Sequence, residues 1–315
     1  MIILTDCLTE KVDEGALKVA NSLTKRIKEK YSNTKIVSYG KRKSKLSDVH
    51  LSLNKFFLNK SLIKMINDEN DELLYIPFSS NTKASIIRTF VLSLFTKKNL
   101  KVLFVLKHPM NSFFAYLLKV SKSKIYVLSK ESQEYFESFG INNVNYIKTG
   151  VDVHKFIPVS NEEKRTLRDK YQIDQNEKII LHVGHLHQGR NIETLMLFKE
   201  LAKPVLVVSS VSKQDDLLRK KIENNGIKTI DYYIPNIEEL YQLSDIYFFP
   251  VMEIENCIDV PLSVLEAAAC NLPIVTTQYG ELKSFVNEDG FIFIESFDKE
   301  KLSTNFKSIE HGYVE

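Results

Sequence analysis

Short apolar runs alternate with helical patterns along most of the chain, and this alternation constrains the fold more than any other feature. The first run, "MIILT", reads as a buried strand, and the segment after it repeats apolar residues at steps of three and four, as an amphipathic helix does. The alternation continues through "KIVSY", "ELLYIP", "KVLFVL", "KIYVLS" and "VNYIK", and it restarts with "KIILHVG", "PVLVVSS", "KTIDYYI", "IYFFPV", "PIVTT" and "GFIFI". Strands that alternate with helices form parallel sheets covered by helices. The sequence therefore predicts an α/β protein with two Rossmann-like, doubly wound parallel-sheet domains.

The junction between the two domains is predicted near "TGVDVHKFIPVS". Gly150, Pro158 and a short polar segment interrupt the periodicity there. We therefore place the domains at residues 1–152 and 153–315, both of which are ordinary domain sizes.

The apolar runs and the cysteines argue for a protein of the cytoplasm. No run reaches the roughly 18 uncharged apolar residues of a membrane span, and the start "MIILTDCLTEKVDEG" lacks the features of a signal peptide. Cys7, Cys257 and Cys270 show no CxxC pairing, so we expect buried thiols rather than a disulfide framework or a zinc cluster.

Charge is distributed unequally, although the formal net charge is only +3. Residues 1–150 carry 25 Lys and Arg against 13 Asp and Glu, which gives +12, whereas the rest carries 18 against 27, which gives −9. The field of the basic half attracts anionic partners such as phospholipid head groups, nucleic acid or a phosphorylated substrate. The alternative is that these are solvated lysines that bind nothing.

The stretch "LHVGHLHQGRNIETL", residues 181–195, places a strand end, two glycines and an arginine together. Ligands bind outside the carboxyl ends of parallel strands, so "GHLHQGR" is a candidate phosphate loop with Arg190 as its cation. A metal site is disfavoured because His182 and His185 point to opposite faces of an extended strand. A nucleotide-hydrolysing P-loop lacks its Lys and its Ser or Thr here, and no GxGxxG occurs. The remaining alternative is that His182 packs in the core and the other two histidines are solvated.

A second candidate lies in "DIYFFPVMEIENCIDVPLSVLEAAACNLPIVTT". A strand ends at Pro250, an acidic loop follows, and a helix is predicted to begin near Pro261 with Asp259 as its cap. Glu266 lies inside that helix among apolar neighbours, so its carboxylate needs a partner or a polar ligand such as the vicinal hydroxyls of a ribose. The alternative is that Glu266 faces solvent.

Three segments together resemble the family 4 retaining glycosyltransferases with the GT-B fold. They are "YVLSKESQEYFESFGINNVNYIKTGVDVHKF", "ILHVGHLHQGRNIETL" and "SDIYFFPVMEIENCIDVPLSVLEAAACNLPIVTTQYG", and the resemblance is good over residues 124–295 and weaker upstream. It implies two domains that face each other across a cleft. The C-terminal domain would bind a nucleotide-sugar donor of unknown base, and the N-terminal domain would bind the acceptor.

The resemblance also implies specific donor-binding residues, with two departures. The family's diphosphate-binding Arg and Lys fall on His185 and Arg190. Of the family's two glutamates, the second falls on Glu266 and the first on Ile258, for which Asp259 or Glu255 could substitute. Ile258 puts sugar recognition and activity in doubt, and His185 would weaken diphosphate binding because an unperturbed imidazole is mostly neutral at pH 7.

Further positions follow from the same resemblance. The donor site would include Gly184, Gly189, the backbone of Leu262 and Ser263, the turn at Gly280, and Tyr233 and Ile234 beside the nucleobase. The catalytic residues would be Arg190 and His108, the latter near the transferred sugar. The acceptor side would be the loop with Asp13, Glu14 and Gly15.

The predicted reaction breaks the bond between the anomeric carbon and the diphosphate. Arg190, with His185, Lys283 and the helix start near Pro261, would stabilise the departing phosphate without a metal or a cofactor. By resemblance the product retains the anomeric configuration. The acceptor is a glycan, a lipid-linked sugar or a small-molecule hydroxyl, and no nucleic-acid partner is expected.

Two questions stay open at this stage. The basic, apolar stretch "KASIIRTFVLSLFTKKNLK" suits an anionic membrane surface at the inner face, or it is an ordinary core helix with snorkelling lysines. The rival to a transferase is a non-catalytic GT-B scaffold or partner subunit with an eroded site, and a sugar-nucleotide epimerase or a phosphorylase is a third possibility.

Overall fold

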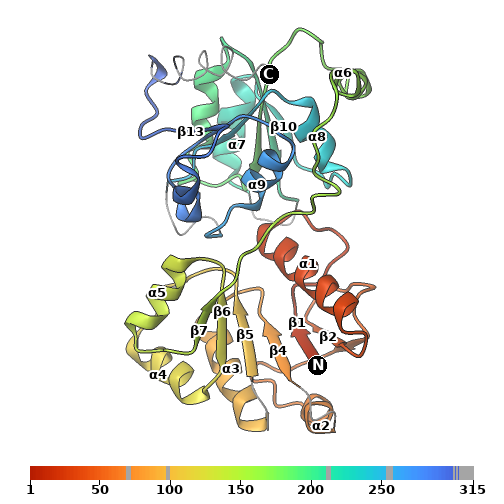
Figure 1. Ribbon diagram of the computed structural model, residues 1–315, viewed down its shortest axis with the longest axis vertical. Helices are drawn as coiled ribbons and strands as arrows, with labels where there is room; N and C mark the ends of the chain where they lie inside the picture. Colours follow the sequence, from red (N-terminus) through yellow and green to blue (C-terminus); the bar gives the residue numbers. More distant parts are fainter. Residues whose placement is uncertain are drawn as a thin grey trace. The chain divides into compact units, whose positions relative to one another are not determined.

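The computed structural model describes residues 1–68, 72–96, 100–210, 214–252 and 258–300, together with residues 302 and 304. The chain forms two compact units, Met1–Thr149 and Gly150–Glu315. Each unit contains one parallel sheet with helices packed on it (Figure 1).

The described residues of the first unit form a seven-stranded sheet in the order β3-β2-β1-β4-β5-β6-β7, with every pair parallel. Its strands are β1 (Ile2–Thr5), β2 (Lys35–Tyr39), β3 (Val49–Leu51), β4 (Leu73–Ile76), β5 (Leu100–Phe104), β6 (Lys124–Val127) and β7 (Val144–Tyr146). Its helices are α1 (Gly15–Lys30), α2 (Lys60–Asp68), α3 (Lys83–Phe95), α4 (Ser112–Ser121) and α5 (Lys130–Ser138). β1 lies between β2 and β4, so the loops that follow β1 and β4 meet at the switch point of the sheet.

Local signals explain where these helices begin. The Glu14 side chain caps α1 by accepting a hydrogen bond from the backbone N–H of Leu17, and the helix then buries Ala16, Val19 and Ala20 against the sheet. Ser129 caps α5 in the same way through the N–H of Ser132. Such caps satisfy N–H groups that have no partner inside the helix.

The described residues of the second unit form a six-stranded parallel sheet in the order β10-β9-β8-β11-β12-β13. Its strands are β8 (Ile179–Gly184), β9 (Lys203–Val208), β10 (Lys228–Ile230), β11 (Ile246–Phe249), β12 (Ile274–Thr276) and β13 (Phe291–Phe293). Its helices are α6 (Asn161–Lys170), the 3-10 helix η1 (Ile192–Phe198), α7 (Asp216–Asn224), α8 (Ile237–Leu243), α9 (Leu262–Ala269) and the 3-10 helix η3 (Gly280–Phe285). The switch point lies between β8 and β11, where both candidate segments of the sequence end up.

A buried ion pair fixes α6 at the amino ends of these strands. Arg168 on α6 is buried, and its guanidinium donates to a carboxylate oxygen of Asp245 at 2.6 Å. The same oxygen accepts a hydrogen bond from the N–H of Ile179 at 2.7 Å. A buried arginine is tolerated because its donors are satisfied in this way.

The structure bears on three further expectations, which concern the fold class, the cysteines and membrane-spanning helices. The prediction of two doubly wound parallel-sheet domains is confirmed. Cys7 and Cys270 are buried free thiols, as expected, and Cys257 lies outside the described residues. Among the described residues, no helix has the length and apolarity needed to cross a membrane.

Candidate functional site

The candidate site is built where β8 and β11 end, at the switch point of the second sheet. β8 ends at Gly184, and the loop of residues 185–191 leads into η1. Asn191 ties this loop to the neighbouring strand end, because its side-chain amide donates to the carbonyl of Pro250 at 3.0 Å. Gly189, at φ +84°, supplies a backbone conformation that glycine adopts without strain and so turns the loop just before Arg190.

His182 lies under this loop and is fully buried, as the core interpretation predicts. Its Nδ1 is 2.8 Å from the carbonyl oxygen of Phe248, and its ring lies beside those of Tyr247 and Phe249. A carbonyl oxygen can only accept, so Nδ1 carries the proton and Nε2 presents a lone pair. Burial, with smaller effects of the Arg190 and His185 charges, lowers the pKa of His182 to about 4. The imidazole is therefore neutral at pH 7, and its buried Nε2 has no hydrogen-bond partner among the described residues.

Arg190 is the central cation of the site. Its side chain is only 5% exposed, yet within the described part of the chain its guanidinium has neither a hydrogen-bond acceptor nor a carboxylate partner. A methyl group on Gly184 would stand 2.8 Å from His182 Nε2 and 3.4 Å from Arg190 Nη1. Gly184 thus allows the His182 imidazole and the Arg190 guanidinium to pack closely at the end of β8. A largely buried guanidinium that has no partner among the described residues favours a bound anion.

Glu266 occupies the next helix of the site, α9, and is only 2% exposed. The Tyr241 hydroxyl, from α8, donates to its Oε2 at 2.8 Å. The alternative of a solvent-facing Glu266 is therefore wrong, and the expected polar partner exists. Burial, followed by the negative charge of Glu266, raises the pKa of Tyr241, so the phenol stays a donor. The pair holds a carboxylate in the interior, where it can accept hydrogen bonds from hydroxyl groups.

The start of α9 differs from the predicted start. Pro261 is the N-cap, so Asp259 lies ahead of the cap position, and the expectation that Asp259 caps the helix is wrong. Proline ends the preceding extended segment with its fixed φ, which is sufficient to start the helix. Leu262, buried, and Ser263, partly exposed, are the first residues of the helix.

Gly280 holds the segment before α9 in place. Its φ is +51°, and a Cβ at this position would stand 2.3 Å from the carbonyl oxygen of Asp259. The same carbonyl accepts a hydrogen bond from the N–H of Glu281 at 3.0 Å. Asp259 itself is buried. Only glycine permits this close approach, which links η3 to the segment that leads into α9.

Residues 163–313 match the family of group 1 glycosyl transferases. The matched segment spans most of the second unit and includes both Arg190 and Glu266. No curated protein sequence matches the chain.

Solved glycosyltransferase structures resemble the chain across both units. HepE from Anabaena, in complex with UDP and glucose, has a TM-score of 0.73 at 15% identity, covering 99% of this chain and 90% of its own. A glycosyltransferase from Rickettsia africae has a TM-score of 0.74 at 17% identity, covering 98% and 88%. WaaG, a glycosyltransferase involved in lipopolysaccharide biosynthesis, has a TM-score of 0.66 at 12% identity, covering 98% and 90%. At these identities the likeness shows the fold, which is GT-B.

Other positions that the family resemblance assigns to the donor side differ in exposure. Ile258 is buried and apolar, so it offers no hydrogen bond where the family resemblance implies a glutamate. Glu255 lies outside the described residues. His185, Tyr233 and Ile234 are partly exposed, and Lys283 is exposed.

The predicted residues of the first unit lie at the carboxyl edge of its sheet. His108 follows β5, and its backbone is held by Asn81, whose side chain accepts from the N–H at 2.7 Å and donates to the carbonyl at 2.9 Å. Asp13 is partly exposed and precedes Glu14, the cap of α1, and Gly15 is the first residue of that helix. Burial raises the pKa of Glu14.

Sequence reasoning missed three polar residues. Asp6 follows β1 directly, where its carboxylate accepts from the N–H of Phe78 at 2.7 Å and burial raises its pKa. Arg42 donates to the carbonyl of Asp6 at 3.4 Å. The position of Asp6 after the first strand could have indicated it, whereas nothing in the sequence connects Tyr241 with Glu266.

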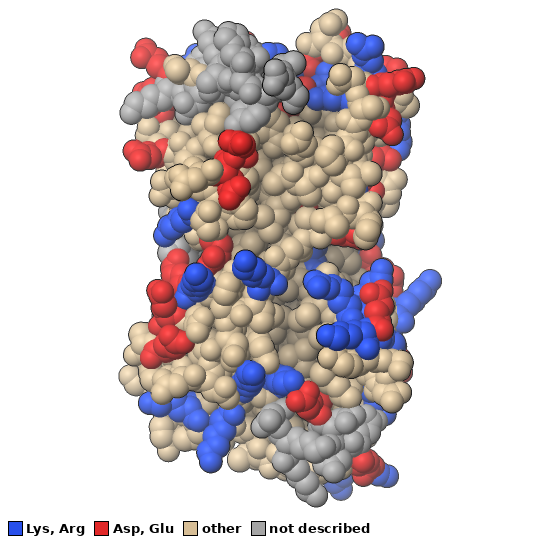
Figure 2. Space-filling model, in the orientation of Figure 1, with Lys and Arg blue, Asp and Glu red and all other residues tan. Residues whose placement is uncertain are grey.

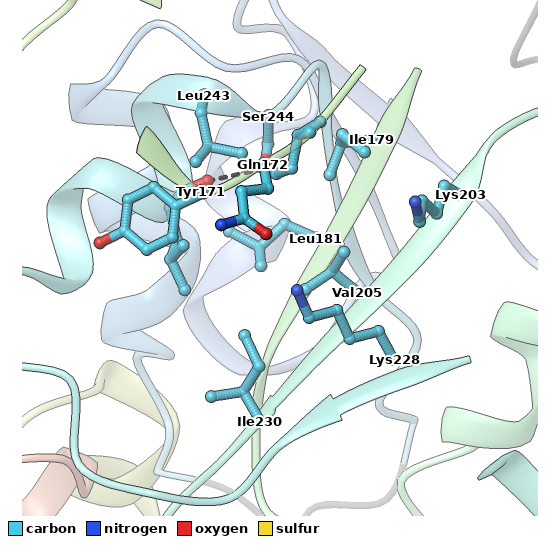
Figure 3. Close-up of a pocket in the computed structure, with 12 residues that line it drawn as sticks. Tyr171, Gln172, Ile179, Leu181, Lys203, Val205, Lys228, Ile230, Leu243 and Ser244 are labelled. Atoms are coloured by element: carbon cyan, nitrogen blue, oxygen red, sulfur yellow. Dashed lines mark hydrogen bonds between the residues drawn. The ribbon is translucent and has the colours of Figure 1, made fainter. Parts of the chain in front are cut away.

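A metal site and a second pocket are the two alternatives to this candidate site. The described residues contain no group of three or more His, Cys, Asp or Glu side chains placed to hold a metal. A small, mostly apolar pocket lies at the opposite edge of the second sheet, lined at the amino ends of β8, β9 and β10 by Ile179, Lys203, Lys228 and their neighbours (Figure 3). Its volume of about 40 Å³ suits a few waters rather than a nucleotide.

Proposed function

We propose that the protein is a family 4 retaining glycosyltransferase that moves a sugar from a nucleotide-sugar donor to a hydroxyl of a glycan, a lipid-linked acceptor or a small molecule. The observation that carries the proposal is Arg190, a buried guanidinium with no acceptor among the described residues, packed beside Gly184 at the end of β8. A buried cation at the carboxyl edge of a parallel sheet is suited to an anion such as a diphosphate.

In this proposal the donor diphosphate binds Arg190, with His185, Gly189 and the backbone of Leu262 and Ser263 beside it. The charge that develops on the departing diphosphate is stabilised by the guanidinium and by the amino end of α9, so the step requires no metal. Gly280 shapes the loop on which Asp259 lies.

Glu266 is proposed to bind the ribose hydroxyls. The hydrogen bond from the Tyr241 hydroxyl holds the buried Glu266 carboxyl group in a fixed position. Tyr233 and Ile234 would lie along the nucleobase. HepE binds UDP, which makes a uridine nucleotide the first donor to test.

The first unit is proposed to supply the acceptor side. Its residues would be Asp13, Glu14 and Gly15, with His108 near the transferred sugar. Retention is proposed to proceed without a covalent sugar intermediate, because the sequence places no obvious carboxylate nucleophile for a two-step route, which agrees with the family resemblance. We also propose that the protein works in the cytoplasm at the inner face of a membrane, on account of the basic first half.

One observation favours a second function. Ile258 occupies the position of a sugar-binding glutamate, which would suit a non-catalytic GT-B scaffold with an eroded site. A scaffold need not bind a nucleotide sugar, so donor binding and turnover separate the two functions.

The test is calorimetry with UDP, GDP, ADP and CDP and their sugar conjugates, followed by turnover with the donor that binds. Arg190→Ala and Glu266→Ala are the informative variants, and Arg165→Ala, at an exposed position on α6, is the matched control. Loss of a charge-assisted hydrogen bond predicts binding weakened about 10- to 100-fold in each site variant and unchanged in the control. A well-folded wild type that binds none of these nucleotides would favour the scaffold.

A further inference from the structure

The outer side of α4 is apolar. Phe113 and Tyr116 are each 61% exposed, and Val120 is 40% exposed. Their spacing of three and four residues places them in one stripe, which we call the α4 face. The opposite side of the same helix buries Ala115 and Leu118 in the core. A helix of a water-soluble domain normally has a polar outer side, so an apolar one indicates a contact with something else.

The neighbouring helix α3 also carries one exposed apolar side chain. α3 packs against α4, and Leu94 near its end is 64% exposed. The rest of α3 behaves as a core helix, because Ile86, Thr89 and Leu92 are buried. The core interpretation of "KASIIRTFVLSLFTKKNLK" is therefore correct for most of that stretch, and the exposed apolar surface lies mainly on α4.

The chain segment that contains α4 is basic, although Lys101 and Lys107 pair with Glu72 and Glu131 at its two ends. Residues 73–130 contain ten Lys and Arg and no Asp or Glu. Lys119 and Lys122 are exposed beside the stripe, and neither forms an ion pair with any described residue. Figure 2 shows Lys and Arg side chains, with few Asp or Glu, over the region where Figure 1 draws α4. The field over this region attracts an anionic surface.

We propose that the α4 face docks the protein on an anionic lipid bilayer. Aromatic and aliphatic side chains with lysines beside them match a helix that lies in the plane of the head groups. Phe113, Tyr116 and Val120 enter the acyl boundary, and Lys119 and Lys122 contact lipid phosphates. Each lysine near such a surface contributes roughly a fivefold gain in affinity. The α4 face is thus the proposed contact for the membrane location given under the proposed function. The docking proposal does not depend on sugar transfer.

The experiment is flotation of the full chain with vesicles of phosphatidylcholine alone and with vesicles that also contain phosphatidylglycerol, without any sugar donor. The apolar variant is Phe113→Ser/Tyr116→Ser/Val120→Ser, and the charge variant is Lys119→Glu/Lys122→Glu. Leu217→Ser on α7, at a side chain that is 76% exposed, is the matched control in the second unit. Circular dichroism and size-exclusion chromatography check that each variant is folded and monitor its oligomeric state.

We expect the wild type and the control to bind the anionic vesicles at least about tenfold more tightly than the neutral ones, and we expect high salt to reduce this binding. Both α4 variants should lose at least about tenfold. Arg190→Ala should float like the wild type, which separates this proposal from the transferase. The proposal would be overturned if the wild type bound neutral and anionic vesicles equally, or if the α4 variants bound like the control. It would also be overturned if the wild type were a dimer that dissociates in the apolar variant. Tighter binding to a nucleic acid than to the vesicles would also overturn it.

Discussion

Gly184 is the residue on which the geometry of the site depends most directly. A methyl group there would meet His182 Nε2 and approach Arg190 Nη1, and neither neighbour can move far because both are buried. We predict that Gly184→Ala displaces the guanidinium and weakens nucleotide binding about 10- to 100-fold, while overpacking lowers the free energy of unfolding by about 1–3 kcal/mol. Calorimetry and urea unfolding measure the two effects. Gly150→Ala is the control, since nothing lies within 4 Å of its Cβ position. Unchanged binding in Gly184→Ala would contradict the role given to Gly184 in positioning Arg190.

His182 gives the fold a pH dependence. Its pKa falls from 6.5 to about 4 on folding, because burial disfavours the charged imidazole. The unfolded chain therefore binds this proton below pH 6.5 and the folded chain does not, so stability falls as the pH drops toward 4. Integration from pH 7 to pH 4 gives a loss of about 3 kcal/mol from this residue. Urea unfolding at several pH values should show that His182→Phe lacks this part of the loss. An exposed-site variant, His154→Gln, should keep it, and equal pH profiles for wild type and His182→Phe would refute the assignment.

At the scale of the elements, the sequence predicted most strands but not which helices and side chains contact one another. Central strands of a parallel sheet are buried on both faces, so most of the strands left a continuous apolar run in the sequence. "NIETLMLFKEL" repeats apolar residues as an α-helix does, yet it forms the 3-10 helix η1, preceded by Asn191 at φ 54°. The edge strand β3, "VHL", is too short and too exposed to leave a pattern.

The candidate site could also be predicted only in part from the sequence. Gly184 and Arg190 stand at a strand end, which local pattern can identify. The contact of Tyr241 with Glu266 depends on how α8 packs against α9, and no spacing in the sequence encodes that packing. The exposure of Phe113 and Tyr116 likewise depends on how the helices pack. "SFFAYLLKVS" is apolar on all sides, so only the packed structure shows which side remains uncovered.

At the scale of the whole molecule, the two units have separate sheets and separate cores. A ligand held mainly by the second unit should therefore stabilise that unit and leave the first nearly unchanged. At a hundred times its Kd, a nucleotide adds about 2.7 kcal/mol to the stability of the state that binds it. This corresponds to roughly a hundredfold slower exchange for core amides of β8 and β11 that exchange only through unfolding.

Hydrogen exchange followed by mass spectrometry resolves the two units peptide by peptide, and it suits a chain that has no Trp to report unfolding. With the nucleotide identified by calorimetry, peptides of β8, α9 and β11 should gain protection and those of β1 and β4 should not. Glu266→Ala with the same nucleotide should show little gain. Equal protection of both units would mean that they unfold together or share the nucleotide, and the donor site could then no longer be assigned to the second unit alone.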